Sequence, residues 1–297
     1  MNAFGRSGWQ RWAPLIGIIP ALALYIAFGI YPSVMTGVYS FTNYSGIAGT
    51  PINFIGFQNY VEAFTSGIFS MLPAIKVTLI FAVSVTIIQN ALGLLLAIVF
   101  NNKVHGVVFY RAVVFLPLVL SVTVTGMLWS LIFAPEGGIA EPIWKAIFGH
   151  ASSFFGSYSL ALPMVIAVQI WQSAGFTMMI YLAGLQAIPN DLNEASALDG
   201  ANRWQRFWGV TFPMVAPSIT VNVLLCIIGS LGSYDLIYVL TNGQFGTQTL
   251  SMYMFSTAFQ GSNELGYASM IQMLQFVLVL IVTVIMQWYL RRREVQL

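Results

Sequence analysis

Six long apolar runs alternate with polar, turn-rich segments along this chain. The runs cover residues 13–35, 75–100, 113–133, 160–183, 215–239 and 270–290. Each has about 20 residues or more, the length that an α-helix needs to cross the hydrocarbon core of a bilayer. The pattern predicts an all-α membrane protein with six transmembrane helices.

The polar segment between the fourth and fifth runs differs from its neighbours in charge. Residues 185–217 read LQAIPNDLNEASALDGANRWQRFWGVTFPMVAP and carry five charged side chains: Asp191, Glu194, Asp199, Arg203 and Arg206. At roughly 2.5 kcal/mol per charge, burying all five in lipid would cost on the order of 12 kcal/mol. The segment is therefore expected to lie in water.

Turn chemistry in this segment predicts a helix, a corner and a second helix. Asp191 with Glu194 has the spacing of a capping box and predicts the start of the first helix. Gly200 stands where a left-handed residue would end that helix. Asn202 with Gln205 repeats the capping spacing for the second helix.

Composition supports an integral membrane protein. Of 297 residues, 58% are hydrophobic and only 7% are charged, against roughly 25% charged in soluble domains. A net charge of +2 gives no basis for a nucleic-acid partner, and the single cysteine, Cys226, excludes an internal disulfide. We find no G-x-x-x-x-G-K-[ST] motif for ATP, and expect no enzyme activity on this chain.

The distribution of lysine and arginine predicts the orientation. One side of the predicted membrane would hold nine of them, Arg6, Arg11, Lys103, Arg111, Arg203, Arg206, Arg291, Arg292 and Arg293, and the other side only Lys76 and Lys145. Because basic loops stay in the cytoplasm, both termini and the polar segment are expected there. The predicted organisation is a cytoplasmic segment 1–12, a membrane domain 13–290 and a cytoplasmic tail 291–297.

The polar segment also resembles a known family signature. Glu194-Ala195-Ser196, Gly200-Ala201 and Phe212-Pro213 resemble the EAA loop of bacterial ABC-importer permeases. The longer reading, with Ile188-Pro189, Leu192 and Asp199, is most similar to the carbohydrate-uptake branch, the relatives of the maltose permease subunits. The chain departs from that pattern at Ser196, where the family has alanine, and at Asn193, where it often has tyrosine. Residues 54–60, FIGFQNY, with Phe64 resemble a second signature in the first external loop.

This resemblance implies a type I ABC importer permease of MetI-like fold. The cytoplasmic loop 189–213 would then couple to an ABC ATPase dimer, with ATP and magnesium bound on that partner and no cofactor or metal on this chain. The coupling residues would be Leu192, Glu194, Ala195, Ser196, Asp199, Gly200, Ala201 and Pro213, the last of which is expected to end the second helix. The other implied partners are a second permease, in a heterodimer, and an extracytoplasmic binding protein in a bacterial inner membrane.

Polar side chains form stripes on the fourth and fifth runs. On the fifth run, Asn222, Cys226, Ser230 and Ser233 are spaced by four, four and three residues, so they share one helical face. Such faces turn away from lipid, either to another helix or to a water-filled path. By resemblance, these positions coincide with the sugar site of the maltose permease relatives. The candidate substrate path comprises Gln169, Gln172, Ser173, Phe176, Cys226, Ser230, Ser233 and Tyr234.

Several alternatives stay open at this point. Leu192, Ala195 and Leu198 share a face that would pack either on the permease itself or in a groove of the ATPase. The solute would be a sugar or oligosaccharide, or a glycerol-phosphate-like compound. An ion-coupled transporter would need an acid within the membrane, and only Asp235 is close to a span. No catalytic constellation is apparent.

Overall fold

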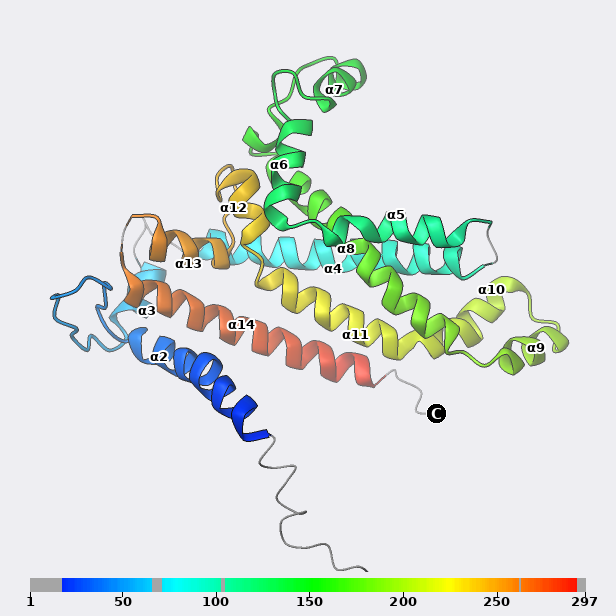
Figure 1. Ribbon diagram of the computed structural model, residues 1–297, viewed down its shortest axis with the longest axis horizontal. Helices are drawn as coiled ribbons and strands as arrows, with labels where there is room; N and C mark the ends of the chain where they lie inside the picture. Colours follow the sequence, from blue (N-terminus) through cyan, green and yellow to red (C-terminus); the bar gives the residue numbers. More distant parts are fainter. Residues whose placement is uncertain (1–17, 66–70, 103–104, 262, 293–297) are drawn as a thin grey trace, which may run out of the picture.

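A computed structural model describes residues 18–65, 71–102, 105–261 and 263–292 (Figure 1). These residues form helices joined by loops, and the only bridge of β type is an isolated pair between Thr42 and Phe54. The predicted all-α class is therefore confirmed.

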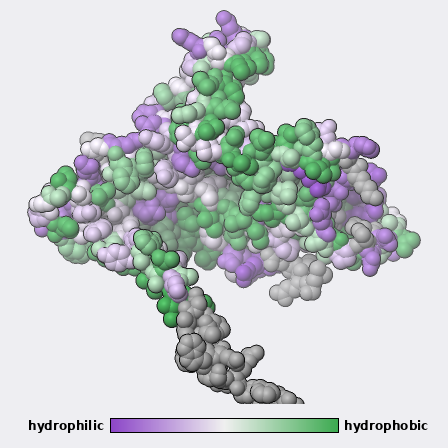
Figure 2. Space-filling model, in the orientation of Figure 1, coloured by the Kyte–Doolittle hydropathy of each residue, from purple (hydrophilic) through white to green (hydrophobic). Residues whose placement is uncertain are grey.

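Five helices are long and apolar enough to cross a membrane, and a bent pair of shorter helices makes a sixth span if it is counted as one. The five are Ile18–Tyr39, which ends in α2 (Tyr31–Tyr39), α4 (Leu72–Asn101), α8 (Ala161–Gln186), Arg203–Leu231, and α14 (Leu265–Arg291). They run roughly side by side along the long axis of the molecule (Figure 1). Hydrophobic side chains cover much of the surface over these helices (Figure 2).

The third span is bent, which the sequence prediction missed. Residues 113–133 were expected to form one helix, but α5 (Val107–Val119) and α6 (Val122–Ile132) meet at 101°. Pro117 lies in the last turn of α5, Leu120 is extended with ψ 137°, and the Ser121 hydroxyl accepts a bond from Val124 N to cap α6. A proline followed by a helix-capping residue is the local cause of the break.

The fifth span starts and ends earlier than the prediction of 215–239. A continuous helical stretch runs from α10 (Arg203–Arg206) through η3 (Phe207–Thr211) into α11 (Phe212–Leu231). The expectation that Pro213 ends a helix is wrong, because Pro213 lies in the first turn of α11 and follows the π turn of η3. Pro213 removes one backbone hydrogen bond inside this continuous stretch, next to the π turn, which is a common site of such an irregularity. The chain breaks instead at Gly232, before the short helix α12 (Asp235–Thr241).

The chain also forms short helices, namely α3 (Gln58–Thr65), α7 (Ala140–Phe148), η2 (Phe154–Gly156), α12 and α13 (Leu250–Phe259). Helices α3 and α13 lie at one end of the bundle, whereas α7 projects from its side beyond α6 (Figure 1). The FIGFQNY segment holds α3 to the end of α2. Asn59 is buried and its side-chain amide donates to Ser40 O (2.9 Å) and Thr42 O (3.1 Å), while the Tyr60 hydroxyl donates to Ser40 Oγ (2.9 Å). This signature therefore has a structural role in the fold.

Buried polar side chains join α4, α8 and α11 in the middle of the bundle. Gln89 Nε2 donates to Thr177 Oγ1 (2.8 Å), and Asn222 Nδ2 donates to the Thr177 carbonyl (3.3 Å). The helices approach closely here, since a Cβ added at Gly93 would lie 2.5 Å from Thr177 Cγ2. Small residues and interhelical hydrogen bonds are the usual means by which membrane helices associate.

Candidate functional site

The polar loop between α8 and α11 forms the helix–corner–helix that its turn residues predict. Helix α9 (Asn190–Leu198) ends in a Schellman motif, in which Gly200 N donates to Ala197 O and Ala201 N donates to Ser196 O, both at 3.1 Å. Gly200 has a φ of +80°, a left-handed conformation that glycine adopts without strain. The loop therefore has a defined corner.

The second helix of the loop has the predicted cap, but the first does not. Asn202 Oδ1 accepts from Gln205 N and Gln205 Oε1 accepts from Asn202 N, both at 2.9 Å, which completes a capping box on α10. At α9 the N-cap residue is Pro189, and no side chain caps the helix. The prediction that Asp191 and Glu194 form a cap is wrong. Asp191 lies in the first turn, where its charge is stabilised by the helix dipole.

One face of α9 is left uncovered by the rest of the described chain. Leu198 is 89% exposed, Leu192 is 40% exposed, and Ala195 between them is exposed as well. The described chain therefore favours the alternative in which this face is free to contact a partner. Trp204, in α10, is also 70% exposed. Exposed leucine side chains on one face of a short helix are typical of a surface that contacts another protein.

The remaining coupling candidates lie on or beside this face. Glu194 and Asp199 are exposed, Ser196 and Ala201 are partly buried at the corner, and Pro213 is partly buried at the start of α11. The loop thus brings Leu192 through Ala201 together, while Pro213 lies one helix further along.

Two adjoining cavities lie between α8 and α11, and the eight path candidates all line one or both of them. The inner cavity has a volume of about 160 Å³ and includes Gln169, Ser173, Phe176, Cys226 and Ser230 in its lining. The outer one, of about 500 Å³, includes Gln169, Gln172, Ser173, Ser233 and Tyr234. The cavities share Leu118, Gln169, Ser173 and Gly229, so they follow each other along the two helices.

The polar side chains that line the cavities are not all equally free to bind a solute. Gln172 is buried, and its amide nitrogen donates to Leu120 O (3.2 Å) and Thr125 Oγ1 (3.3 Å), on either side of the bend between α5 and α6. Gln169 Nε2 donates only to Ser173 Oγ (3.1 Å), in the next turn of the same helix. Gln172 therefore braces the bend, whereas Gln169 can exchange its bond for one to a solute.

Aromatic rings border both cavities of this path. Tyr234 stacks on Phe255 of α13 with ring centroids 5.1 Å apart, and Phe176 is 41% exposed beside the inner cavity. Hydrogen-bonding side chains with an adjacent aromatic face form the kind of surface that small polar ligands require.

The sequence prediction missed several residues of the cavities. Leu118 comes from α5, and Gln89 and Thr177 join the inner cavity from α4 and α8. Gly229 lines both cavities. A polar pair in the second apolar run, Gln89 with Asn90, was the available signal for α4. The apolar Leu118 and the glycine carry no such signal.

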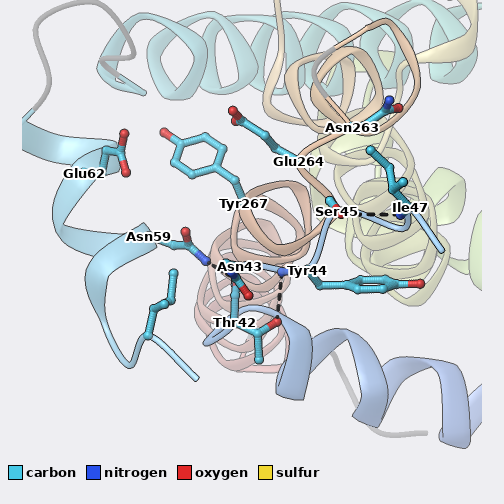
Figure 3. A pocket seen from close by; sticks show the side chains of 11 residues that line it. Thr42, Asn43, Tyr44, Ser45, Ile47, Asn59, Glu62, Asn263, Glu264 and Tyr267 are labelled. Atoms are coloured by element: carbon cyan, nitrogen blue, oxygen red, sulfur yellow. Dashed lines mark hydrogen bonds between the residues drawn. The ribbon is translucent and has the colours of Figure 1, made fainter. Parts of the chain in front are cut away.

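A third cavity, of about 340 Å³, lies at the end of the bundle that carries α3. Figure 3 shows Glu62 from α3, Glu264 and Tyr267 pointing into the same space. It lies beside the hydrogen bond from the Asn59 side-chain amide to Thr42 O, which joins α3 to the end of α2. In the described part of the chain, no three His, Cys, Asp or Glu side chains are grouped so as to hold a metal ion.

Comparison with known proteins identifies the family. Residues 89–295 match the family described as the binding-protein-dependent transport system inner membrane component. The chain is 33% identical over 281 residues to the multiple sugar-binding transport system permease protein MsmF of Streptococcus mutans, covering 93% of this chain and 94% of that one. It is 30% identical to a probable starch degradation products transport system permease protein, AmyD, of Thermoanaerobacterium thermosulfurigenes, covering 99% and 98% of the two chains.

The fold agrees with this assignment. A chain in the crystal structure of a bacterial alginate ABC transporter, in complex with an alginate pentasaccharide-bound periplasmic protein, superposes with a TM-score of 0.83. The two chains are 23% identical, and the match covers 97% of this chain and 98% of the other. The MetI-like permease fold is therefore confirmed, and the protein belongs to the family of binding-protein-dependent transport system inner membrane components, the permease subunits of ABC importers.

Proposed function

We propose that this permease forms half of a path for a sugar or oligosaccharide, and that the path runs along the two cavities between α8 and α11. The observation that carries the proposal is the lining, which combines amides, hydroxyls and a thiol with aromatic rings. It extends from Gln169 and Phe176 on α8 to Ser230 on α11 and Tyr234 at the start of α12. Sugar hydroxyls require hydrogen-bond partners, and the C–H faces of a sugar ring pack on aromatic side chains.

The charge of the lining favours a neutral solute over a glycerol-phosphate-like one. Among the described residues that line the two cavities there is no lysine or arginine, and the only charged side chain is that of Asp235. A phosphate group would be repelled by this carboxylate and would find no cation to bind. The names of the relatives, which refer to sugars and starch products, point to the same class of solute.

The partners follow from the exposed loop and the family. An ABC ATPase dimer would dock on loop 189–213 through the open face of α9, and would bind ATP and magnesium itself. A second permease, in a heterodimer, would close the path from the other side. An extracytoplasmic binding protein would deliver the solute to the end that carries α3 and α13. Both termini would lie in the cytoplasm of a bacterium, as the nine-to-two distribution of basic residues favours.

Uptake by the reconstituted transporter tests this function. Proteoliposomes that hold the two permeases and the ATPase, with ATP inside and the binding protein outside, are expected to accumulate a neutral sugar or oligosaccharide. Accumulation should stop when the binding protein or ATP is omitted. Uptake of glycerol phosphate without uptake of any neutral sugar would contradict the proposed substrate class.

A further inference from the structure

A large cavity lies behind the coupling loop, where α4 and α8 end and α10 begins. Its volume is about 820 Å³. Ile98 and Leu185 form apolar walls, Asn101 lies at the end of α4, and Arg203, Arg206 and Trp204 contribute from α10. The cavity is separate from the two cavities of the path, since none of its lining residues occurs in them.

The cations of this cavity have no counter-ion in the described part of the chain. Neither Arg203 nor Arg206 forms an ion pair there, and Arg206 Nε is buried without an acceptor. Arg111 on α5 does not line the cavity, and its guanidinium donates to the carbonyl of Phe100, next to Asn101. The described lining of the cavity thus holds two arginine side chains and no Asp or Glu, a charge that favours an anionic ligand.

Shape and position indicate the chemistry of a ligand that would fit this cavity. Arginine side chains present planar forks of donors that fit the oxygens of a phosphate group. The apolar walls formed by Ile98 and Leu185 suit an acyl chain, which a soluble phosphate lacks. The exposed Trp204 and Trp208 lie beside the arginines, as tryptophan side chains do at the boundary between lipid and water. Figure 2 shows hydrophilic side chains gathered beside hydrophobic ones at this end of the molecule.

We propose that this cavity binds the headgroup phosphate of an anionic phospholipid of the adjacent leaflet. The lipid would lie between the ends of α4 and α8 and the helix α10, immediately before the π turn of η3. Basic pockets between membrane helices on the cytoplasmic side are suited to anionic headgroups. The lipid would thereby hold the joint between the coupling loop and the fifth span.

Lipid retention by the purified complete transporter tests the proposal. Native mass spectrometry would count phosphatidylglycerol and phosphatidylethanolamine bound after delipidation and addition of an equal mixture. Wild type is expected to retain phosphatidylglycerol preferentially, and the double variant R203Q/R206Q to bind it about thirtyfold more weakly, since each basic side chain near a surface contributes about 1 kcal/mol. The matched control is R291Q/R292Q, which removes two basic side chains at the end of α14, outside the cavity.

If the double variant does not assemble, the single variant R203Q, which changes an exposed residue, provides a second measurement. It should weaken the retention of phosphatidylglycerol about fivefold. Retention lowered in the cavity variants and unchanged in the control supports the site. Equal binding of both lipids to wild type, an equal loss in the control, or displacement of the lipid by excess inorganic phosphate would overturn it. None of these outcomes depends on which solute the transporter carries.

Discussion

Replacing Ser230 with leucine is expected to lower solute uptake by at least about tenfold while the protein still inserts and binds its ATPase. Ser230 is 5% exposed and lines the inner cavity. Loss of its hydroxyl would leave a buried sugar hydroxyl without a partner, at a cost of about 1–3 kcal/mol, and the added side chain would occupy much of a cavity of about 160 Å³. Uptake by proteoliposomes, normalised to the amount of assembled transporter, measures the effect.

Two controls separate the path from simple helix packing. Ser230→Ala removes the hydroxyl without added bulk and should reduce uptake less. Val221→Leu adds bulk to an exposed position of the same helix and should leave uptake unchanged. If Ser230 serves only to pack α11 against its neighbours, Ser230→Leu would lower the yield of folded protein first, and transport per folded molecule would stay normal.

Gly200→Val is expected to abolish uptake because it disrupts the corner of the coupling loop. Valine is strained at a φ of +80°, so the Schellman motif that ends α9 would be lost. Glu194→Lys should have a similar effect by a different route, since it reverses an exposed charge on the open face of α9 without altering the corner. Both variants should insert, co-purify with less ATPase and lose solute-stimulated ATP hydrolysis.

Gly137→Val is the matched control for the backbone. Gly137 has the same φ of +80°, and a Cβ there would meet no atom within 4 Å, as at Gly200. It lies between α6 and α7, remote from the coupling loop (Figure 1). Comparable loss of the ATPase from Gly137→Val and Gly200→Val would mean that general strain, and not the coupling loop, causes the defect.

The sequence predicts those features of the fold that depend on local pattern. Length and hydrophobicity locate the apolar runs, and the spacing of turn residues predicts Gly200 and the Asn202–Gln205 box. Pro117 and Ser121 are local signals of the bend at Leu120. They were not used because the surrounding residues form one long, mostly apolar run, which predicts a single span. The prediction for Pro213 was wrong because a proline usually ends or kinks a helix, whereas here the helix continues past it next to a π turn.

The candidate path could be predicted only in part. The helical spacing of polar residues shows which side chains share one face of a helix, but it does not show which residues of other helices lie opposite that face. Ser230 and Gln169 follow from spacing on single helices. The bracing bonds of Gln172 to Leu120 and Thr125 depend on how α8 meets the bent third span, some 50 residues earlier in the chain. Leu118 and Gly229 line both cavities for the same long-range reason.

The reactivity of Cys226 tests the central claim most directly. It is the only cysteine of the chain, it lines the inner cavity, and it shares that lining with Gln169 and Ser230. In the assembled transporter, a small neutral thiol reagent should modify Cys226, as followed by mass spectrometry of its peptide, and saturating solute should slow the reaction. A thiol that stays inert in every state of the ATP cycle, or that reacts at the same rate with and without solute, would contradict a path between α8 and α11.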